Sequence, residues 1–307
     1  MKKYLLLTHL LLCTILCVAQ NRITVSPSSP MDRAVSGHYA GWINGELMTY
    51  GGCNFPDVPC ADGGQKVFYP IAYGASVSVP QGVVFLGGMN AESSIAECRF
   101  VNATDGTSSN IASLPKGLDN FAAAYHDGVI FVAGGQSNGI PNKDVYALSF
   151  PGEGEEWKVV ASLPDKCRLQ PCMAVQNTSA GNRLFVFGGY QPKAEGQEAV
   201  LHTDGVHIPV AELKNGCVSP SQWKRTSSAM AVTDEIVDGK HVRRLQAVVG
   251  STCTPVGCSH ILFFGGVDHD IFYSAICGQQ DSLYLRHAPE WYCFREDVLT
   301  YHTITDS

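Results

Sequence analysis

The sequence predicts an all-β fold, and within that class a β-propeller, on three observations. The chain of 307 residues contains 31 glycines and 16 prolines, and few of its apolar stretches have a helical period. A short apolar run that ends in two glycines occurs five times. Each run follows a turn, and short strands rich in small residues lie upstream, which is the pattern of a β-hairpin. Hairpins repeated in this way indicate a fold built from packed copies of one unit.

The five runs are expected to be the second strands of these hairpins. They are LMTYGG (47–52), VVFLGG (83–88), IFVAGG (130–135), LFVFGG (184–189) and LFFGG (262–266). First strands are clearest in YGASVSV (73–79), FAAAYHD (121–127) and PCMAVQN (171–177). We expect the paired glycines to lie where backbones approach closely near the centre of the fold, because a Cβ would clash there.

The third copy shows the whole repeating unit. After its double glycine come DVYALSF (144–150) and EWKVVASLP (156–164), which supply two outer strands that carry a Tyr and a Trp. A four-stranded meander has two apolar faces, and it buries both only when copies pack around a common axis. A double glycine followed by Tyr and then Trp resembles the kelch repeat, and this resemblance implies a kelch-type β-propeller.

Some copies are expected to be incomplete. Between the first two double glycines there is room for a long loop (53–69) and one inner hairpin, so the outer strands of the first copy are expected to be missing. Before the last double glycine lies a weakly patterned stretch, 206–245, in which Trp223 would mark a fourth strand. We therefore expect about five blade cores and exposed strand edges, which self-association or a partner polypeptide could cover.

The N-terminus has the features of an export signal. Lys2 and Lys3 precede an apolar run, 5–18, and Cys17-Val18-Ala19 fits a cleavage site. We expect a signal peptide over 1–19 that is cut after Ala19, a lead-in segment over 20–36 and a propeller domain over 37–307. The protein would then be periplasmic or secreted, with a lipid anchor on Cys17 as the alternative. The apolar run is too short for a spanning helix, and no later segment is long enough.

Charge and cysteine content restrict the partners and cofactors. The formal net charge of −7 argues against a nucleic-acid or anionic-membrane partner, because either needs a basic face. In an oxidising compartment, cysteines close in sequence are expected to form short-loop disulfides, and buried free thiols are the alternative. The close pairs are Cys53/Cys60, Cys167/Cys172 and Cys253/Cys258. Neither the cysteine nor the histidine spacing matches a zinc site, so we expect no metal and no cofactor.

Three segments resemble a more specific family. They are GGCNFPDVPCADGGQKVFY (51–69), AYGASVSVPQGVVFLGGMN (72–90) and FFGGVDHDIFYSA (263–275), the last followed by APEWYCFREDVLTY (288–301). Over most of residues 37–306 the chain resembles the N-acetylneuraminate epimerases, or sialic acid mutarotases, and in particular their cyclically permuted branch. The resemblance implies six blades and an isomerase that interconverts the α and β anomers of free sialic acid. A base would remove the anomeric proton, an acid would protonate the ring oxygen, and a cation would hold the carboxylate.

The catalytic pair that the resemblance implies, a Glu and an Arg, has no convincing counterpart. In the family the pair lies in a segment that reads Ile-Asn-Gly-Glu, then Lys-Pro-Gly, then Arg-Thr. Ile43-Asn44-Gly45-Glu46 matches only its beginning, and the LMTYGG that follows makes Asn44-Gly45 a hairpin turn. In the permuted branch this segment would come after residue 307. We therefore expect a truncated or internally deleted relative, and we assign no catalytic residue.

Six residues are candidates for substrate contact, because ligands of propellers meet the loops at one mouth of the central channel. They are Asn54, Asp57 and Lys66 after the first double glycine, Asn120 and Arg168 between blades, and Asp268 after the last double glycine. Arg168 is the best candidate for holding a carboxylate, and Asn120 is expected at the equivalent position one blade earlier. Structural roles compete with binding for most of the six: turns or caps for Asn54, Asp57 and Asp268, plain surface for Lys66, and an interblade salt bridge for Arg168.

Two other functions compete with the mutarotase hypothesis. A non-catalytic kelch propeller that binds a glycan or a protein would account for the missing Glu/Arg segment. A kelch-type copper oxidase would need a Tyr-Cys crosslink with His and Tyr ligands around the channel. Tyr292 and Cys293 are neighbours in sequence, but nothing else in the chain encodes such a site.

Overall fold

The computed structural model describes residues 30–152, 154–164, 167–213, 216, 218–226, 232–237, 240–295 and 297–307. Val35–Ser307 form one compact body. The expected signal peptide, 1–19, and most of the lead-in segment lie outside the described residues, so both stay predictions. Among the described residues, no helix has the length and apolar character needed to cross a bilayer.

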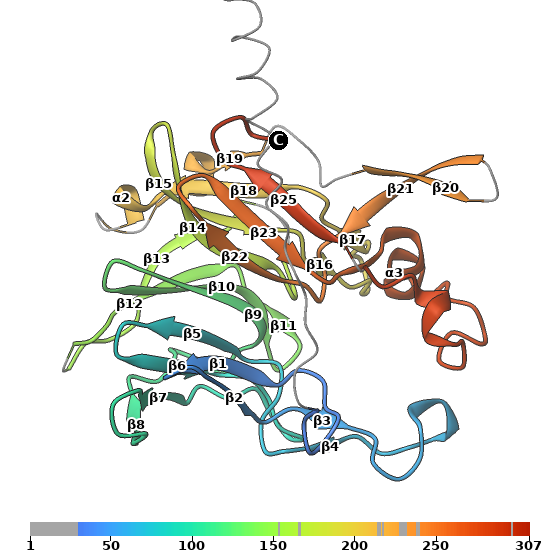
Figure 1. Ribbon diagram of the computed structural model, residues 1–307, viewed down its shortest axis with the longest axis horizontal. Helices are drawn as coiled ribbons and strands as arrows, with labels where there is room; N and C mark the ends of the chain where they lie inside the picture. The colour runs from blue at the N-terminus through green and yellow to red at the C-terminus, as the bar shows by residue number, and fades with distance from the viewer. Residues whose placement is uncertain are drawn as a thin grey trace, which may run out of the picture. The chain divides into compact units, whose positions relative to one another are not determined.

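Five antiparallel hairpins form the inner part of this body (Figure 1), and they confirm the five expected blade cores. In each hairpin the second strand is one of the runs that end in a double glycine. We number the hairpins, each with its outer strands, as units one to five. They are β1 (Tyr39–Ile43) with β2 (Glu46–Tyr50), β5 (Ala75–Val79) with β6 (Gly82–Leu86), β9 (Asp119–His126) with β10 (Val129–Ser137), β14 (Cys172–Thr178) with β15 (Gly181–Phe187), and β22 (Thr252–Val256) with β23 (His260–Phe264).

Units two to five are blades of three or more strands, because outer strands continue their sheets. These strands are β7 (Cys98–Asn102), β8 (Ser108–Ile111), β12 (Asp144–Ser149), β13 (Lys158–Ser162), β18 (Gly205–Pro209), β19 (Lys224–Arg225) and β25 (Val298–His302). The sheet orders are β5-β6-β7-β8, β9-β10-β12-β13, β14-β15-β18-β19 and β22-β23-β25. Unit one is the two-stranded sheet β1-β2, as expected from the short spacing between the first two double glycines.

Shorter elements interrupt or extend this plan. The strands among them are β3 (Cys53–Asn54), β4 (Val67–Phe68), β11 (Ile140–Pro141), β16 (Tyr190–Gln191), β17 (Val200–Leu201), β20 (Val232–Val237), β21 (Lys240–Ala247) and β24 (Val267–Asp268). The helices are α2 (Val210–Leu213) and α3 (His269–Ile276), with 3₁₀ turns η1 (Cys60–Asp62), η2 (Pro220–Gln222) and η3 (Pro289–Tyr292). Helix α3 follows the last double glycine and the short strand β24.

The core lies between successive units. The innermost strands pack in chain order, β1 on β5, β5 on β9, β9 on β14 and β14 on β22. Apolar side chains from facing sheets form a separate cluster at each of these junctions. Trp157 and Trp223, each just before a fourth strand, are buried in two of the clusters, and the Trp157 indole donates to the Ala112 carbonyl across 2.9 Å. This face-to-face packing of consecutive sheets is the arrangement of a β-propeller.

The paired glycines lie under the connection that leads to the next unit. The Gly135 N–H donates to the Arg168 carbonyl across 2.9 Å, and the Gly88 N–H donates in the same way to Leu118. Gly134 has a φ of +76°, and a Cβ placed there would lie 2.4 Å from the Arg168 carbonyl oxygen. Both the left-handed conformation and the lack of room therefore require glycine. The expected close approach is confirmed, and the close neighbour is the interblade connection.

His207, on β18, is expected to make folding sensitive to pH. Its ring stacks on Phe185 with centroids 5.0 Å apart, and its Nδ1 lies 2.9 Å from the Arg183 guanidinium. Burial, followed by the positive charge of Arg183, lowers the pKa of His207 from 6.5 to about 4. The unfolded chain takes up this proton near pH 6.5, whereas the folded chain does not until about pH 4. The folded state therefore loses stability as pH falls through this window.

We expect His207 to remove about 1–2 kcal/mol of unfolding free energy between pH 6.5 and pH 4, since partial exposure weakens the effect of the full shift. Urea unfolding at several pH values measures it, with His207→Gln as the variant that cannot titrate. The wild type should lose more stability than the variant across the window. Parallel curves for the two proteins would show that His207 does not carry this dependence.

Candidate functional site

A ring of left-handed residues surrounds one end of the central channel. Its members are Gly37, Tyr73, Asn120, Gln170 and Gly250, with φ values of 64°, 59°, 54°, 50° and 70°. Asn120 is the second residue of β9, and each of the others lies two residues before the innermost strand of its unit. Hydrogen bonds join the members of units one to four, because the N–H of Tyr73 donates to Gly37, that of Asn120 to Tyr73 and that of Gln170 to Asn120, across 2.7 to 2.8 Å. These bonds hold the starts of the inner strands at a common level.

All five ring residues line a cavity of about 450 Å³. The rest of its described wall comes from the first residues of the inner strands and their neighbours, including His38, Ser76, Ser251 and Thr252. The described lining contains no Asp, Glu, Lys or Arg side chain. The hydroxyl of Ser251 is buried and has no hydrogen-bond partner among the described residues. Volume, concavity and a few convergent polar groups are the features of a small-molecule site.

Asn120 is the one predicted site residue that lines this cavity. Its side-chain NH₂ donates to Asp119 across 2.7 Å, and its amide oxygen accepts from Gln170 across 2.9 Å. The expected equivalence with Arg168 is wrong. On the ring, the residue equivalent to Asn120 in the next unit is Gln170. The residue equivalent to Arg168 is Leu118, because the carbonyl of each accepts from the second glycine of a pair. Equivalent positions were misjudged because the connections share no sequence pattern.

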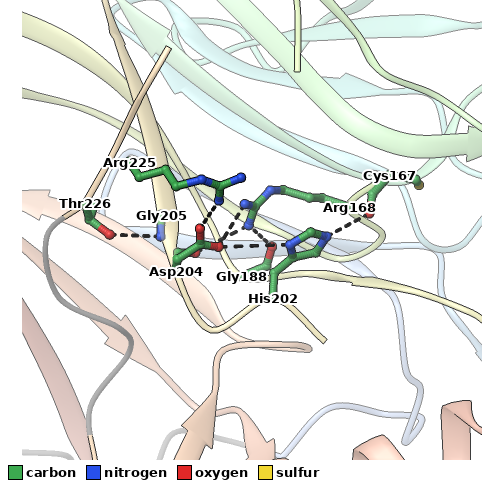
Figure 2. A network of polar contacts seen from close by, with 8 residues as sticks. All are labelled: Cys167, Arg168, Gly188, His202, Asp204, Gly205, Arg225 and Thr226. Carbon is green, nitrogen blue, oxygen red and sulfur yellow. Dashed lines mark hydrogen bonds and ion pairs between the residues drawn. The ribbon is translucent and has the colours of Figure 1, made fainter. Parts of the chain in front are cut away.

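Arg168 lies outside the described lining of the cavity and is fully buried. Figure 2 shows its guanidinium directed at Asp204 and at the carbonyl oxygen of Gly188. The distances are 3.0 Å from Nη2 to the Asp204 carboxylate and 2.7 Å from Nη1 to the Gly188 carbonyl. Arg168 is therefore in a salt bridge, but this bridge joins the connection before unit four to unit four itself, and not two blades as the competing structural role had expected. The bridge occupies the guanidinium that a substrate carboxylate would need.

Asp204 is the centre of this buried network. Arg225 pairs with its second carboxylate oxygen, and His202 lies 4.0 Å from the first. The Nε2 of His202 is also 3.2 Å from the Cys167 carbonyl oxygen. Burial acts to raise the pKa of the Asp204 carboxyl, but the charges and hydrogen bonds of Arg168 and Arg225 outweigh it and lower the pKa. The network thus ties the connection before unit four to the body of that unit.

Lys66 is outside the described lining of the cavity, but its cation contacts the lining residue Tyr73. Its side chain is exposed, and its Nζ donates to the hydroxyl of the ring residue Tyr73 across 3.4 Å. The same Nζ lies 5.3 Å from the centroid of the Tyr73 ring and 5.7 Å from that of Phe55, which are cation–π distances. The loop that carries Lys66 is held from the far end of the chain, where Arg286 pairs with Asp62 across 2.7 Å.

Asn54 and Asp268 make local hydrogen bonds, and Asp57 is exposed. The Asn54 amide oxygen accepts from the Tyr69 hydroxyl across 2.9 Å, inside the loop, and Asp57 is exposed in the same loop. Asp268 caps helix α3, because its carboxylate accepts from the N–H groups of Asp270 and Ile271. None of the three is in the described lining of the cavity. A role in substrate contact stays a prediction for each.

Glu46 lies at the wrong end of its strand to act in the cavity. Asn44 and Gly45 form the left-handed turn between β1 and β2, and Ile43 pairs with Glu46, which confirms the hairpin turn expected from the sequence. Strand β2 then runs through Tyr50 to the double glycine at the ring. Five residues of extended strand separate Glu46 from that level by about 16 Å.

The expected short-loop disulfides are not present. All six cysteines of the three pairs have free thiols. The Cys53 thiol donates to the Tyr73 hydroxyl across 3.2 Å, and Cys167 donates to the Gly135 carbonyl across 3.5 Å. Cys53, in the loop after unit one, therefore contacts unit two. Cys167 contacts unit three, whereas its sequence neighbour Cys172 lies in unit four. Within the described part of the chain, no three His, Cys, Asp or Glu side chains gather into a group that could hold a metal ion.

Sequence reasoning missed most of the cavity wall. His38, Tyr73, Gln170, Cys172 and Cys253 all line it and were not predicted. The signal that could have found them is positional, since each lies within a few residues of the start of an inner strand. Residue type alone gave no such indication, because Tyr and Gln are uncommon in the left-handed conformation.

Comparison with known proteins supports this architecture. The family model for the Kelch motif matches residues 118–164, which span unit three from β9 to β13. The fold is a kelch-type β-propeller. A solved structure described as "Structure of YjhT" is similar to this propeller at 13% sequence identity and a TM-score of 0.61, covering 82% of this chain and 83% of the other. The comparison with curated protein sequences gave no match.

Proposed function

We propose that this kelch propeller is an exported, sialic acid mutarotase-like protein that binds a free sugar acid in its central cavity. One observation carries the proposal: Tyr73 lines a cavity of about 450 Å³ that has polar groups in its wall, and the Lys66 ammonium lies 3.4 Å from the Tyr73 hydroxyl. That arrangement suits a ligand with many hydroxyls and one carboxylate. The loop segments that resemble the sialic acid mutarotases include the loop of Lys66 and the ring residue Tyr73.

Anomer interconversion needs a proton acceptor and a proton donor beside the bound sugar. His38 supplies the imidazole of the described lining, and an imidazole nitrogen is a proton acceptor. The Tyr73 hydroxyl and the Lys66 ammonium lie within 3.4 Å of each other and could donate. We assign His38 the role of proton acceptor at the anomeric hydroxyl, and Lys66 that of holding the carboxylate.

Removing the Lys66 charge is expected to weaken binding of N-acetylneuraminate about tenfold, since one charge-assisted hydrogen bond is lost. Calorimetric titration of the wild type and Lys66→Met measures it. The methyl ester of the sugar, which lacks the anionic group, should bind both proteins equally weakly. Lys158→Met, at an exposed position on the outer strand β13, is the matched control and should leave affinity unchanged. Equal affinity in Lys66→Met and wild type would remove Lys66 from the site.

Catalysis is tested separately from binding. Proton NMR of freshly released α-anomer should show faster conversion with the wild type than in buffer. His38→Gln should lower that acceleration about tenfold or more. Its affinity for N-acetylneuraminate, which depends on Lys66, should stay unchanged. Binding without any acceleration would favour the non-catalytic glycan-binding propeller over the mutarotase. Export is tested by fractionating the expressing cells and sequencing the mature N-terminus, which we expect at Gln20.

A further inference from the structure

Two cysteines from neighbouring blades meet in the wall of the central cavity. Cys172 begins β14 and Cys253 is the second residue of β22, and these are the innermost strands of units four and five. The two strands pack against each other, and both cysteines line the cavity. Cys172 is buried and Cys253 is partly buried, so an oxidant in the cavity has access to the pair through Cys253.

The contacts of each thiol lead to the backbone beside the other cysteine. The Cys253 thiol donates to the carbonyl of Met173, the residue after Cys172, across 3.3 Å. The Cys172 thiol lies 3.5 Å from the carbonyl oxygen of Ser251, two residues before Cys253. A hydrogen bond with the Cys253 thiol, followed by burial, raises the pKa of Cys172 well above its ordinary value. The two sulfur atoms therefore face each other across the junction between the strands.

We propose that Cys172 and Cys253 form a disulfide that joins units four and five when the protein meets an oxidising thiol–disulfide couple. The oxidant is a small disulfide such as oxidised glutathione. The Cys253 thiolate attacks one sulfur of the oxidant and releases one thiolate. Cys172 then gives up its proton and attacks the Cys253 sulfur, which releases the second thiolate. The protein loses two protons and two electrons, and the oxidant becomes two thiols.

This bond would fasten unit five, which has fewer strands than the three units before it. The sheet of unit five has three strands, whereas the sheets of units two to four have at least four. A link between residues that lie far apart in the chain restricts the unfolded state more than a short-loop disulfide does. Oxidation is therefore expected to raise the melting temperature, and it would hold one wall of the cavity in place.

Peptide mapping tests the bond directly. The purified full chain is equilibrated with oxidised glutathione, its remaining thiols are alkylated under denaturing conditions, and it is digested without reductant. We expect a linked peptide pair that contains Cys172 and Cys253, lighter by two hydrogen atoms than the sum of the reduced peptides. Alkylation of both residues after complete equilibration, or a link from either one to a different cysteine, would overturn the proposal.

Melting curves with and without reductant provide an independent measurement. The wild type should melt at a lower temperature in reductant, and Cys253→Ser should show no such difference. Cys258→Ser is the matched control, because Cys258 is the sequence neighbour of Cys253 and its side chain is exposed. It should retain the wild-type response to reductant. Loss of the response in Cys258→Ser together with its persistence in Cys253→Ser would show that the bond lies elsewhere.

Discussion

Replacing Asp204 with Asn is expected to lower the unfolding free energy by about 3 kcal/mol or more. The substitution keeps the shape of the side chain but leaves the guanidinium of Arg168, which is fully buried, without its carboxylate. An uncompensated buried charge is costly because it has given up water without gaining an opposite charge. Urea unfolding followed by tryptophan fluorescence measures the loss.

Two further variants separate the buried pair from the exposed one. Arg225, whose side chain is 58% exposed, also pairs with Asp204. Arg225→Ala should therefore lower the unfolding free energy by less than about 1 kcal/mol. The double variant Arg168→Met with Asp204→Asn should recover part of the loss, because no buried charge is left unpaired. If Asp204→Asn and Arg225→Ala were equally mild, the buried salt bridge would not be a major source of stability.

The same residue should contribute to acid sensitivity. Because the pKa of Asp204 is lowered in the folded protein, its contribution is complete above the unfolded value of about 3.9 and is lost as pH falls through the lowered pKa. Below about pH 4, the wild type should therefore lose stability more steeply than Asp204→Asn. This window lies below the one expected for His207, so the two effects can be told apart.

The second large effect is expected for Gly134→Ala, at roughly 3 kcal/mol or more. The new Cβ would lie 2.4 Å from the Arg168 carbonyl oxygen, and the residue would have to keep a φ of +76°. To relieve this clash, the connection that leads to unit four would have to shift. That shift would also disturb the hydrogen bond from Gly135 to the Arg168 carbonyl. Thermal and urea unfolding give the size of the effect.

Gly139→Ala is the matched control for that substitution. Gly139 has a nearly identical φ of +80°, but a Cβ there meets nothing within 4 Å. It should cost only the conformational penalty, about 1–2 kcal/mol. The difference between the two variants isolates the close approach of the interblade connection. Equal losses would mean that left-handed strain alone explains the double glycines.

Much of the fold could be predicted because its signals are local. The double glycines, the turns such as Asn44-Gly45 and the strand alternation each depend on a few adjacent residues. All five hairpins and the outer strands of unit three lie where the pattern placed them. Trp223 correctly marked the fourth strand of unit four, β19, which begins at the next residue. The residues around it have too weak a pattern to indicate a strand.

The site was predicted less well because it depends on which connections face the channel. Arg168 has the chemistry of a carboxylate ligand, yet its position two residues before the ring directs it into the junction beside unit four. Asn120 lies on the ring and lines the cavity, and so does Gln170, which was not predicted. In an irregular connection, a shift of two residues decides whether a side chain is buried or lines the cavity. No repeating pattern in the sequence indicates which of the two positions a residue takes.

By itself, then, the sequence determined the repeating hairpins, their turns and the glycines that end them, because each is set by contacts within one unit. Only the tertiary structure decided the neighbours across units and across the connections between them. It placed Lys66 against Tyr73, paired Arg168 with Asp204, and brought Cys172 to Cys253 instead of to Cys167. The physical reason is that packing of successive sheets joins residues far apart in the chain, and spacing along the sequence carries no record of that distance.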